Sequence, residues 1–215
     1  MFTGIIEGLG EVARLEAQGG GARLEVRTPP EWSPLETGES IAVNGVCLTV
    51  VEPGPGRFAV DLSAETLRRT RFGALGPGEP VNLERALTPD KKMSGHFVQG
   101  HVDGVATILS LEHLPGEVLI RLEHPPELTP YLIEKGSVAV DGISLTVFDC
   151  RDQAFTVSII PYTWEHTNLH ARKSGDRVHL ECDMIGKYVV RACETLFRGD
   201  CSQGRPASPQ PPDSE

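Results

Sequence analysis

Two side chains in this sequence offer a proton acceptor and a nucleophile. His101 follows Gly100 in a glycine-flanked run, and Cys47 lies in an apolar run. An imidazole exchanges protons near neutral pH and can act as a general base, and a thiolate can attack electron-poor carbon. Each residue also has a purely structural interpretation. His101 can be a hydrogen-bonded histidine without a chemical role, and Cys47 can be a small buried hydrophobic residue, which is what most free cysteines are.

Hydroxyl groups accompany these residues. Ser40, Thr49 and Thr146 lie in strand-like runs, where a hydroxyl either contacts a ligand or satisfies neighbouring backbone groups. His96, His101 and Cys47 are too scattered to form a compact ligand set, so we expect no metal site.

The candidate residues belong to a duplicated sequence. With a shift of 97 residues, 16 of the 47 positions from 39 to 85 are identical, against about three expected by chance. Cys47 then aligns with Ser144, and a shift of 96 aligns Ile5 with His101. Two sites of similar shape but different chemistry are therefore expected, with the imidazole in one half only.

The elements that hold these residues are mainly strands. Short runs rich in β-branched residues, at 41–51, 58–62 and 81–83, are punctuated by Gly, Pro and Asn. A small closed barrel in each half would remove exposed sheet edges. Short helices are predicted at 64–71 and 162–170.

The C-terminal part differs from the repeats. Residues 184–198 place apolar side chains on one face at helical spacing, and this helix has no counterpart in the first half. We expect its apolar face to contact a neighbouring subunit. From residue 200 the chain is rich in Pro and Ser, which predicts a disordered tail.

Composition narrows the class of protein. The net charge of -10 and the scattered basic residues disfavour nucleic-acid binding. No apolar run approaches the length of a membrane span, and the first residues do not resemble a secretory signal. The five cysteines are odd in number and lack close pairing, which indicates free thiols in a reducing cytoplasm.

Several segments resemble the riboflavin synthase family. They are Met1-Phe2-Thr3-Gly4-Ile5, the paired Asn-Gly-x-Cys-Leu-Thr-Val and Asp-Gly-Ile-Ser-Leu-Thr-Val segments, and the run from Ser94 to Gly104. The resemblance implies two tandem, similar Greek-key six-stranded β-barrels followed by a C-terminal α-helix. It divides the chain into barrels at 1–96 and 97–183, an oligomerisation helix at 184–199 and a tail at 200–215. It also implies a homotrimer and suggests lumazine synthase as a candidate partner.

The same resemblance implies a reaction. Two molecules of 6,7-dimethyl-8-ribityllumazine exchange a four-carbon unit and give riboflavin and 5-amino-6-(D-ribitylamino)uracil, without a metal or redox cofactor. The first step removes a proton from the C7 methyl group of one substrate, which suits His101 as base. We expect catalytic residues at His101, Cys47, Ser40 and Thr146.

The resemblance also places substrate-binding residues, which we assign by repeat. The first pocket is assigned Gly4, Ile5, Ile6, Cys47, Leu48, Thr49, Asp61, Leu62, Ser63, Ala64, Glu65 and Thr66. The second pocket is assigned Gly100, His101, Val102, Lys135, Ser144, Leu145, Thr146, Ile159, Ile160, Pro161, Tyr162, Thr163 and Trp164.

Some roles stay open. Asp61 or Glu65 is a candidate for binding the ribityl hydroxyls, and Tyr162 and Trp164 are bulky enough to narrow the second pocket. Asp183 either pairs with a histidine across the site or caps a helix. The alternative function is a non-catalytic lumazine- or flavin-binding protein of the same fold, which an intact His101 disfavours. A flavin reductase is less favoured because no glycine-rich phosphate loop follows a strand.

Overall fold

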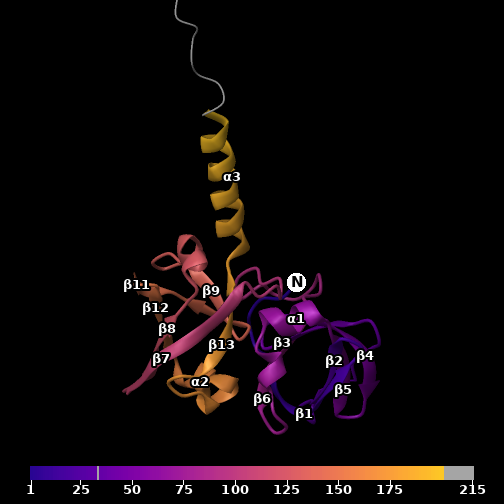
Figure 1. Ribbon diagram of the computed structural model, residues 1–215. Helices are drawn as coiled ribbons and strands as arrows, with labels where there is room; N and C mark the ends of the chain where they lie inside the picture. The colour runs from indigo at the N-terminus through magenta and orange to yellow at the C-terminus, as the bar shows by residue number, and fades with distance from the viewer. Residues whose placement is uncertain (33, 201–215) are drawn as a thin grey trace, which may run out of the picture.

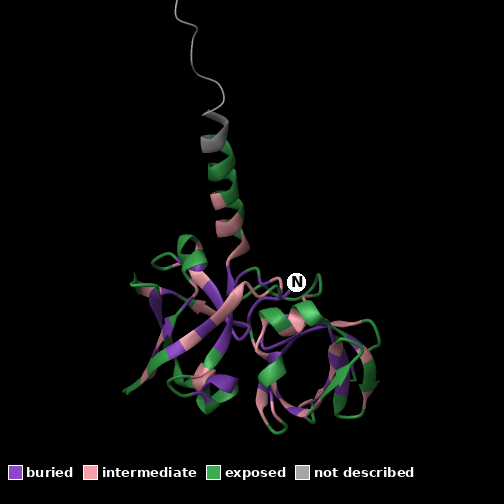
Figure 2. Cartoon of the chain, viewed as in Figure 1, coloured by how far each residue is buried: buried purple, intermediate pink, exposed green. Residues whose placement is uncertain are grey.

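The protein consists of two β-barrels and a helix. The computed structural model describes residues 1–32 and 34–200. Figure 1 shows the barrels side by side, the N-terminus between them and helix α3 (Met184–Asp200) extending away from both. Each barrel has its own buried apolar core, and Figure 2 shows the buried residues as purple stretches along the strands. The predicted mainly β, duplicated architecture with a C-terminal helix is confirmed.

The first barrel is a closed antiparallel sheet with the order β1-β2-β5-β4-β3-β6. Its strands alternate between core and surface: in β2, Ala22, Leu24 and Val26 are buried while the residues between them are more exposed. The strands are β1 (Gly8–Gln18), β2 (Gly21–Arg27), β3 (Ser40–Val43), β4 (Val46–Gly54), β5 (Arg57–Leu62) and β6 (Pro80–Arg85).

The second barrel repeats this order with one strand divided. Its sheet has the order β10-β9-β13-β7-β8-β12-β11, in which β10 and β11 together correspond to β4. The prediction of six strands becomes seven here because the strand is interrupted at Val147, between β10 and β11. Within β11 the pairing with β12 shifts between Phe148 and Arg151, where Asp149 has a φ of 53°. The strands are β7 (Gly104–Leu114), β8 (Glu117–Glu123), β9 (Ser137–Val140), β10 (Ile143–Thr146), β11 (Phe148–Arg151), β12 (Ala154–Ile159) and β13 (Arg177–Cys182).

The predicted run at 41–51 is a hairpin, not one strand. Asn44 and Gly45 both have positive φ, 45° and 76°, which is the backbone of a two-residue type I′ turn. Asp141 and Gly142 form the equivalent turn in the second barrel. The two turns touch, since a Cβ atom on Gly45 would lie 2.6 Å from the nitrogen of Gly142. Glycine is required at this contact between the barrels.

The short helices lie where they were predicted but are each divided. Residues 64–71 form α1 (Ala64–Arg69), which Ser63 caps by accepting from the Thr66 amide, and a 3₁₀ turn η1 (Phe72–Ala74) follows. Residues 162–170 form α2 (Pro161–His166) and η3 (Asn168–Ala171), while η2 (Pro126–Tyr131) precedes β9.

Helix α3 exposes its apolar face. Ile185, Tyr188, Val189 and Leu196 are between 55% and 73% exposed. Within the described residues, no helix is both long and apolar enough to cross a membrane. The predicted tail begins at residue 200, which the structure includes in α3, and the rest of it lies outside the described residues.

A pair of matched side chains joins the barrels. Asn82 donates from Nδ2 to the Asp141 carbonyl (2.9 Å) and accepts the Asn168 amide at Oδ1 (2.7 Å). His179, its repeat equivalent, bonds through Nδ1 to the Asn44 carbonyl (2.8 Å) and accepts the Arg71 amide at Nε2 (2.9 Å). Because Nε2 accepts, the ring is neutral, and burial lowers the pKa of His179.

Candidate active site

A candidate site lies on the outer face of the β3–β4 hairpin. The residues that alternate with Cys47 and Thr49 along β4 are buried in the barrel, so these two side chains face outward. Ser40 pairs with Thr49 in the register of β3 and β4, which brings the predicted hydroxyls together beside the thiol. We call Ser40, Cys47, Thr49 and residues 100–102 the first-barrel site.

Residues 100–102 reach this site from the other half of the chain. The Gly100 carbonyl accepts the Cys47 amide at 2.9 Å, and Val102 packs against the core of the first barrel. Gly100 has a φ of 81°, and a Cβ atom there would lie 2.5 Å from Cβ of Cys47. The exposed residue His101 therefore follows a glycine that is in contact with the strand of Cys47.

The second barrel has the reciprocal arrangement. Ser144 and Thr146 lie on β10, and the Ser144 amide donates to the Gly4 carbonyl at 2.8 Å. Ile6 packs against the core of the second barrel. We call Ser144, Thr146 and residues 4–6 the second-barrel site.

The structure thus corrects the grouping of the predicted residues. The sequence analysis assigns Gly4, Ile5 and Ile6 to the first pocket and Gly100, His101 and Val102 to the second. Residues 4–6 lie instead against the second barrel, and residues 100–102 against the first. The reason is that the two glycine segments cross: Phe2 pairs with Val98, and each segment continues onto the opposite barrel. His101 is therefore on the same barrel as Cys47.

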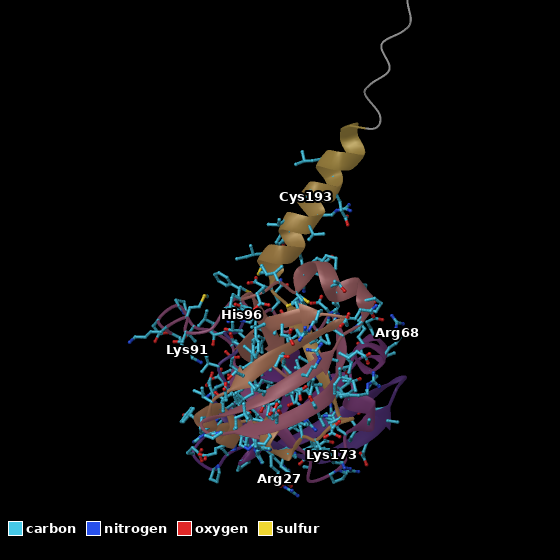
Figure 3. The ribbon with its side chains drawn as sticks, turned by 90° about the vertical axis from the view of Figure 1, so that its left-hand side faces the viewer. Arg27, Arg68, Lys91, His96, Lys173 and Cys193 are labelled. Carbon is cyan, nitrogen blue, oxygen red and sulfur yellow. The ribbon has the colours of Figure 1, made fainter. Side chains whose placement is uncertain are left out.

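His96 was missed as part of the site. Its Nδ1 lies 2.7 Å from Oγ of Ser144, while its Nε2 is buried and makes no hydrogen bond within the described part of the chain. Burial lowers the pKa of His96, and the carboxylate of Asp183 opposes that shift. Figure 3 shows His96 on the side of the barrels from which α3 extends. The sequence signal was present, since His96 lies five residues before His101 in the same motif.

Asp183 caps α3, which is one of the two roles that the sequence left open; it acts on His96 through its charge, and no ion pair joins the two side chains in the described part of the chain. Its Oδ1 accepts the Ile185 amide at 2.9 Å at the start of α3, and its charge favours the protonated form of His96. The cap on α3 and the electrostatics of the second-barrel site are therefore linked through one carboxylate.

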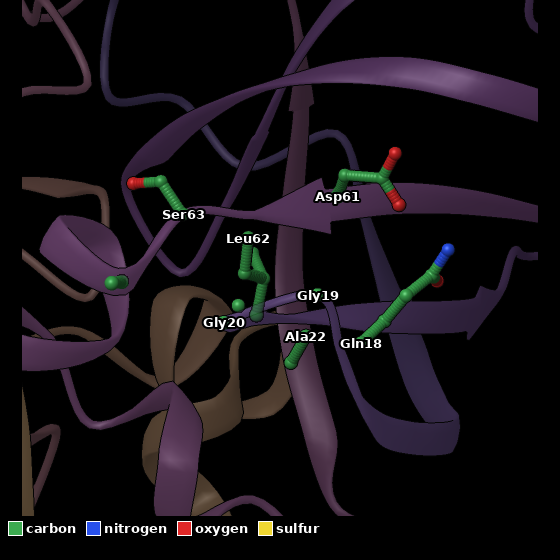
Figure 4. Close-up of a pocket in the computed structure, with 9 residues that line it drawn as sticks. Gln18, Gly19, Gly20, Ala22, Asp61, Leu62 and Ser63 are labelled. Carbon is green, nitrogen blue, oxygen red and sulfur yellow. The ribbon is translucent and has the colours of Figure 1, made fainter.

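Residues 61–66 form the rim of the first barrel. Asp61, Leu62, Ser63 and Ala64 line an open recess of about 590 Å³ together with the β1–β2 turn. Figure 4 shows the residues that line it. The carboxylate of Asp61 is bound by Arg23, at 2.9 Å from Nε, and Glu65 is paired with Arg68 and Arg69. The carboxylates of Asp61 and Glu65, the two candidates for binding the ribityl chain, are therefore already paired with arginines. Of the two, Asp61 lines the recess.

The rim of the second barrel is aromatic. Trp164 packs on the core of that barrel and meets His113 edge to face, whereas Tyr162 is 67% exposed and stacks on His166. Lys135, with a φ of 64°, holds its ammonium group 5.6 Å from the centre of the Phe148 ring. The two rims thus differ, one charged and one aromatic.

The other cysteines differ from Cys47 in their surroundings. Burial raises the pKa of Cys182 to about 12, which makes that thiol unreactive at neutral pH. Cys47 is partly accessible, and Cys150 and Cys193 are exposed thiols. Among residues 1–32 and 34–200, no group of three or more His, Cys, Asp or Glu side chains could hold a metal ion.

Comparisons with known proteins match this arrangement. The lumazine binding domain family matches residues 3–86 and again residues 99–183. A riboflavin synthase from Mycobacterium bovis is 48% identical over 198 residues, which cover 89% of this chain and 97% of the relative. Another from Actinobacillus pleuropneumoniae is 44% identical over 189 residues, 88% of each chain. The chain belongs to the riboflavin synthase family.

Solved structures support the fold of this riboflavin synthase family member. LumP complexed with 6,7-dimethyl-8-(1'-D-ribityl) lumazine superimposes with a TM-score of 0.76 at 23% identity, covering 85% of this chain and 99% of that chain. LumP complexed with riboflavin gives a TM-score of 0.78 at the same identity and coverage. At that identity the likeness establishes the two-barrel fold alone.

Proposed function

We propose that this protein is a transferase that dismutates 6,7-dimethyl-8-ribityllumazine. One molecule gives four carbon atoms to a second, and the products are riboflavin and 5-amino-6-(D-ribitylamino)uracil. Two substrate molecules contain all the atoms of the two products, so the reaction needs no oxidant or reductant. The observation that carries the proposal is the pair of equivalent sites, each built from one barrel's hairpin and a glycine segment that begins in the other half.

The first-barrel site would provide the base. His101 takes a proton from the C7 methyl group of one lumazine, whose anion is delocalised over the electron-poor ring. Cys47, Ser40 and Thr49 lie on one outer face, which the Gly100 backbone touches at Cys47, and their polar atoms there can bind the edge of the ring. Because Cys47 touches the segment of His101, we assign it the role of positioning the substrate. The alternative role for its thiol is attack on a substrate carbon.

The second-barrel site would hold the other lumazine. The Ser144 hydroxyl is fixed by His96 at 2.7 Å, and Thr146 lies two residues further along the same strand. Trp164 and Ile6 cover the neighbouring core and present apolar surface to a flat ring. Differences between the sites fit a reaction in which one substrate is the donor and the other the acceptor.

We further propose that three copies assemble and that a first-barrel site faces a second-barrel site of a neighbouring copy. The exposed apolar face of α3 supports assembly, and so do Ile5, Ile160 and Tyr162, which are 44% to 67% exposed beside the sites. The proposed domains are barrels at 1–96 and 97–183 and a helix at 184–199. We also propose a cytoplasmic location and contact with lumazine synthase.

A non-catalytic lumazine-binding protein is the second candidate. The likeness to LumP in complex with a lumazine favours it. Such a protein needs one ligand site and no base, whereas this chain has two elaborated sites and an exposed imidazole at one of them.

One assay separates the two candidates. Purified, metal-free protein is incubated with 6,7-dimethyl-8-ribityllumazine alone, and both pigments are followed by absorbance. We expect one riboflavin for every two lumazines consumed, and a large loss of rate in His101→Ala. Tight binding without turnover would reject the enzyme and favour the binding protein.

A further inference from the structure

Two buried carboxylates occupy equivalent positions in the two repeats. Glu84 near the end of β6 is 2% exposed, and Glu181 near the end of β13 is 3% exposed. Glu84 accepts the Thr3 amide (2.7 Å), the Thr3 hydroxyl (2.8 Å) and the Gly4 amide (3.0 Å). Glu181 accepts the amides of Gln99 (2.6 Å) and Gly100 (2.9 Å). Each carboxylate thus binds the backbone just before Ile5 or His101.

These groups are costly to bury, which argues that they have a purpose. Burial raises the pKa of Glu84 and of Glu181, and the hydrogen bonds from backbone amides act against that shift. A carboxylate that is ionised can accept both amides at once, whereas a neutral acid or an amide side chain leaves one donor facing a donor. The charge therefore fixes the peptide more firmly than a neutral group of the same shape.

Gly100 is bound on both of its backbone groups, its amide by Glu181 and its carbonyl by β4. The carboxylate binds the amides of Gln99 and Gly100, while the Gly100 carbonyl accepts the Cys47 amide at 2.9 Å. With the φ of 81° at Gly100, these bonds determine where the next residue leaves the backbone. That residue is His101.

We infer that Glu181 is a positioning residue for His101, holding the backbone of residues 99 and 100 against β4 so that the imidazole is presented beside Cys47. The inference rests on the catalytic role proposed for His101. Glu181 itself contacts neither the imidazole nor the substrate; it acts through the backbone.

The duplication supplies a matched control. Glu84 makes the same kind of bond to residues 3 and 4, but the residue that follows is Ile5. A change at Glu84 disturbs the backbone of the second-barrel site without acting on the imidazole. Glu84→Gln and Glu181→Gln therefore make the same chemical change, and only the second is expected to act through His101.

The test is a double-mutant cycle on the full-length protein. Rates of riboflavin formation are measured for Glu181→Gln, Glu84→Gln and His101→Ala, and for each glutamine variant combined with His101→Ala. We expect Glu181→Gln to lower kcat about 10- to 100-fold, with a smaller change in KM. In the His101→Ala background, Glu181→Gln should lower kcat further by less than threefold. Glu84→Gln should lower kcat by the same factor with and without His101→Ala.

Each failure has its own signature. If Glu181→Gln lowers the rate by the same factor with and without His101, or does not lower kcat at all, the positioning role is rejected while the function stands. If His101→Ala alone has wild-type activity, the proposed role of His101 fails first. Circular dichroism and thermal unfolding check the fold. Should Glu181→Gln not fold, Glu181→Asp, which keeps the charge on a shorter side chain, enters the same cycle under the same criteria.

Discussion

The two barrels share one strand order, yet they differ where they would meet substrate. β4 runs unbroken from Val46 to Gly54, whereas its counterpart is divided into β10 and β11. The glycine contact between the barrels and the buried glutamates are the same in both halves. The two halves have therefore kept the same contacts that join them, while the site residues differ.

The largest difference between the two halves is expected at the equivalent positions Ile5 and His101. We expect His101→Ala to lower kcat about 100- to 1000-fold, because it removes the proposed base. Ile5→Ala, at the equivalent position, should lower kcat less than tenfold, since it removes only apolar surface. Steady-state kinetics of riboflavin formation measures both. Equal losses in the two variants would mean that the imidazole has no chemical role.

The next difference is between Asn82 and His179, which make matching bonds across the interface. Burial lowers the pKa of His179 from its ordinary value of 6.5, so the unfolded chain takes up this proton before the folded chain does. Its contribution to stability is full above about pH 6.5 and is lost as pH falls toward the folded-state pKa, at up to about 1.4 kcal/mol per pH unit.

Substitution of each residue separates the bonds from the charge. Asn82→Ala should lower the free energy of unfolding by about 1–3 kcal/mol at both pH 6.5 and pH 5.5. His179→Asn should also destabilise at pH 6.5, but its further loss down to pH 5.5 should be smaller than that of the wild type by about 1 kcal/mol. Urea unfolding at the two pH values measures this. An unchanged pH dependence in His179→Asn would contradict the assignment.

Cys47 and Ser144 offer a smaller contrast. Cys47→Ser gives the first-barrel site the residue that the second already has, and we expect kcat to fall less than tenfold because the thiol positions substrate. The same assay, with the substrate KM recorded, checks this. A loss of 100-fold or more would instead assign the sulfur to attack on carbon.

The divided strand should show in hydrogen exchange. β11 pairs with β12 only at Phe148 and Arg151, whereas the equivalent stretch of β4 pairs continuously with β5 from Glu52 to Gly54. We expect amides in residues 148–151 to exchange about tenfold faster than those of Val51, Glu52 and Gly54 in the equivalent stretch, where Pro53 has no amide hydrogen. Mass spectrometry of proteolytic fragments measures both, and β2 and β8 serve as the equally paired control. Equal rates would show that the division has no effect on local stability.

The sequence predicted the repeat, the β class and the C-terminal helix, because identities at a fixed shift and apolar spacing are local properties. It missed the turn at Asn44 and Gly45, although Asn-Gly is a strong turn signal, because the apolar run on both sides reads as continuous. It also placed Gly4 and Gly100 on the wrong barrels. A shift between repeats shows which residues are equivalent, but not which ones touch.

Three functional candidates escaped for the same reason. Glu84 and Glu181 align in the repeat, but a glutamate in a strand usually faces solvent, and nothing local indicates that their partners are amides about 80 residues away. His96 was considered only as a metal ligand, since its partner Ser144 lies 48 residues further along.

The crossing of the glycine segments has a consequence for the origin of the chain. Because residues 4–6 lie on the second barrel and residues 100–102 on the first, the two halves have the relation of a domain-swapped dimer whose subunits are joined end to end. An ancestral single-barrel chain would have completed its site with a segment from a second copy of itself. In a fused chain the two copies need not be identical, and this chain has His101 in one half where the other half has Ile5.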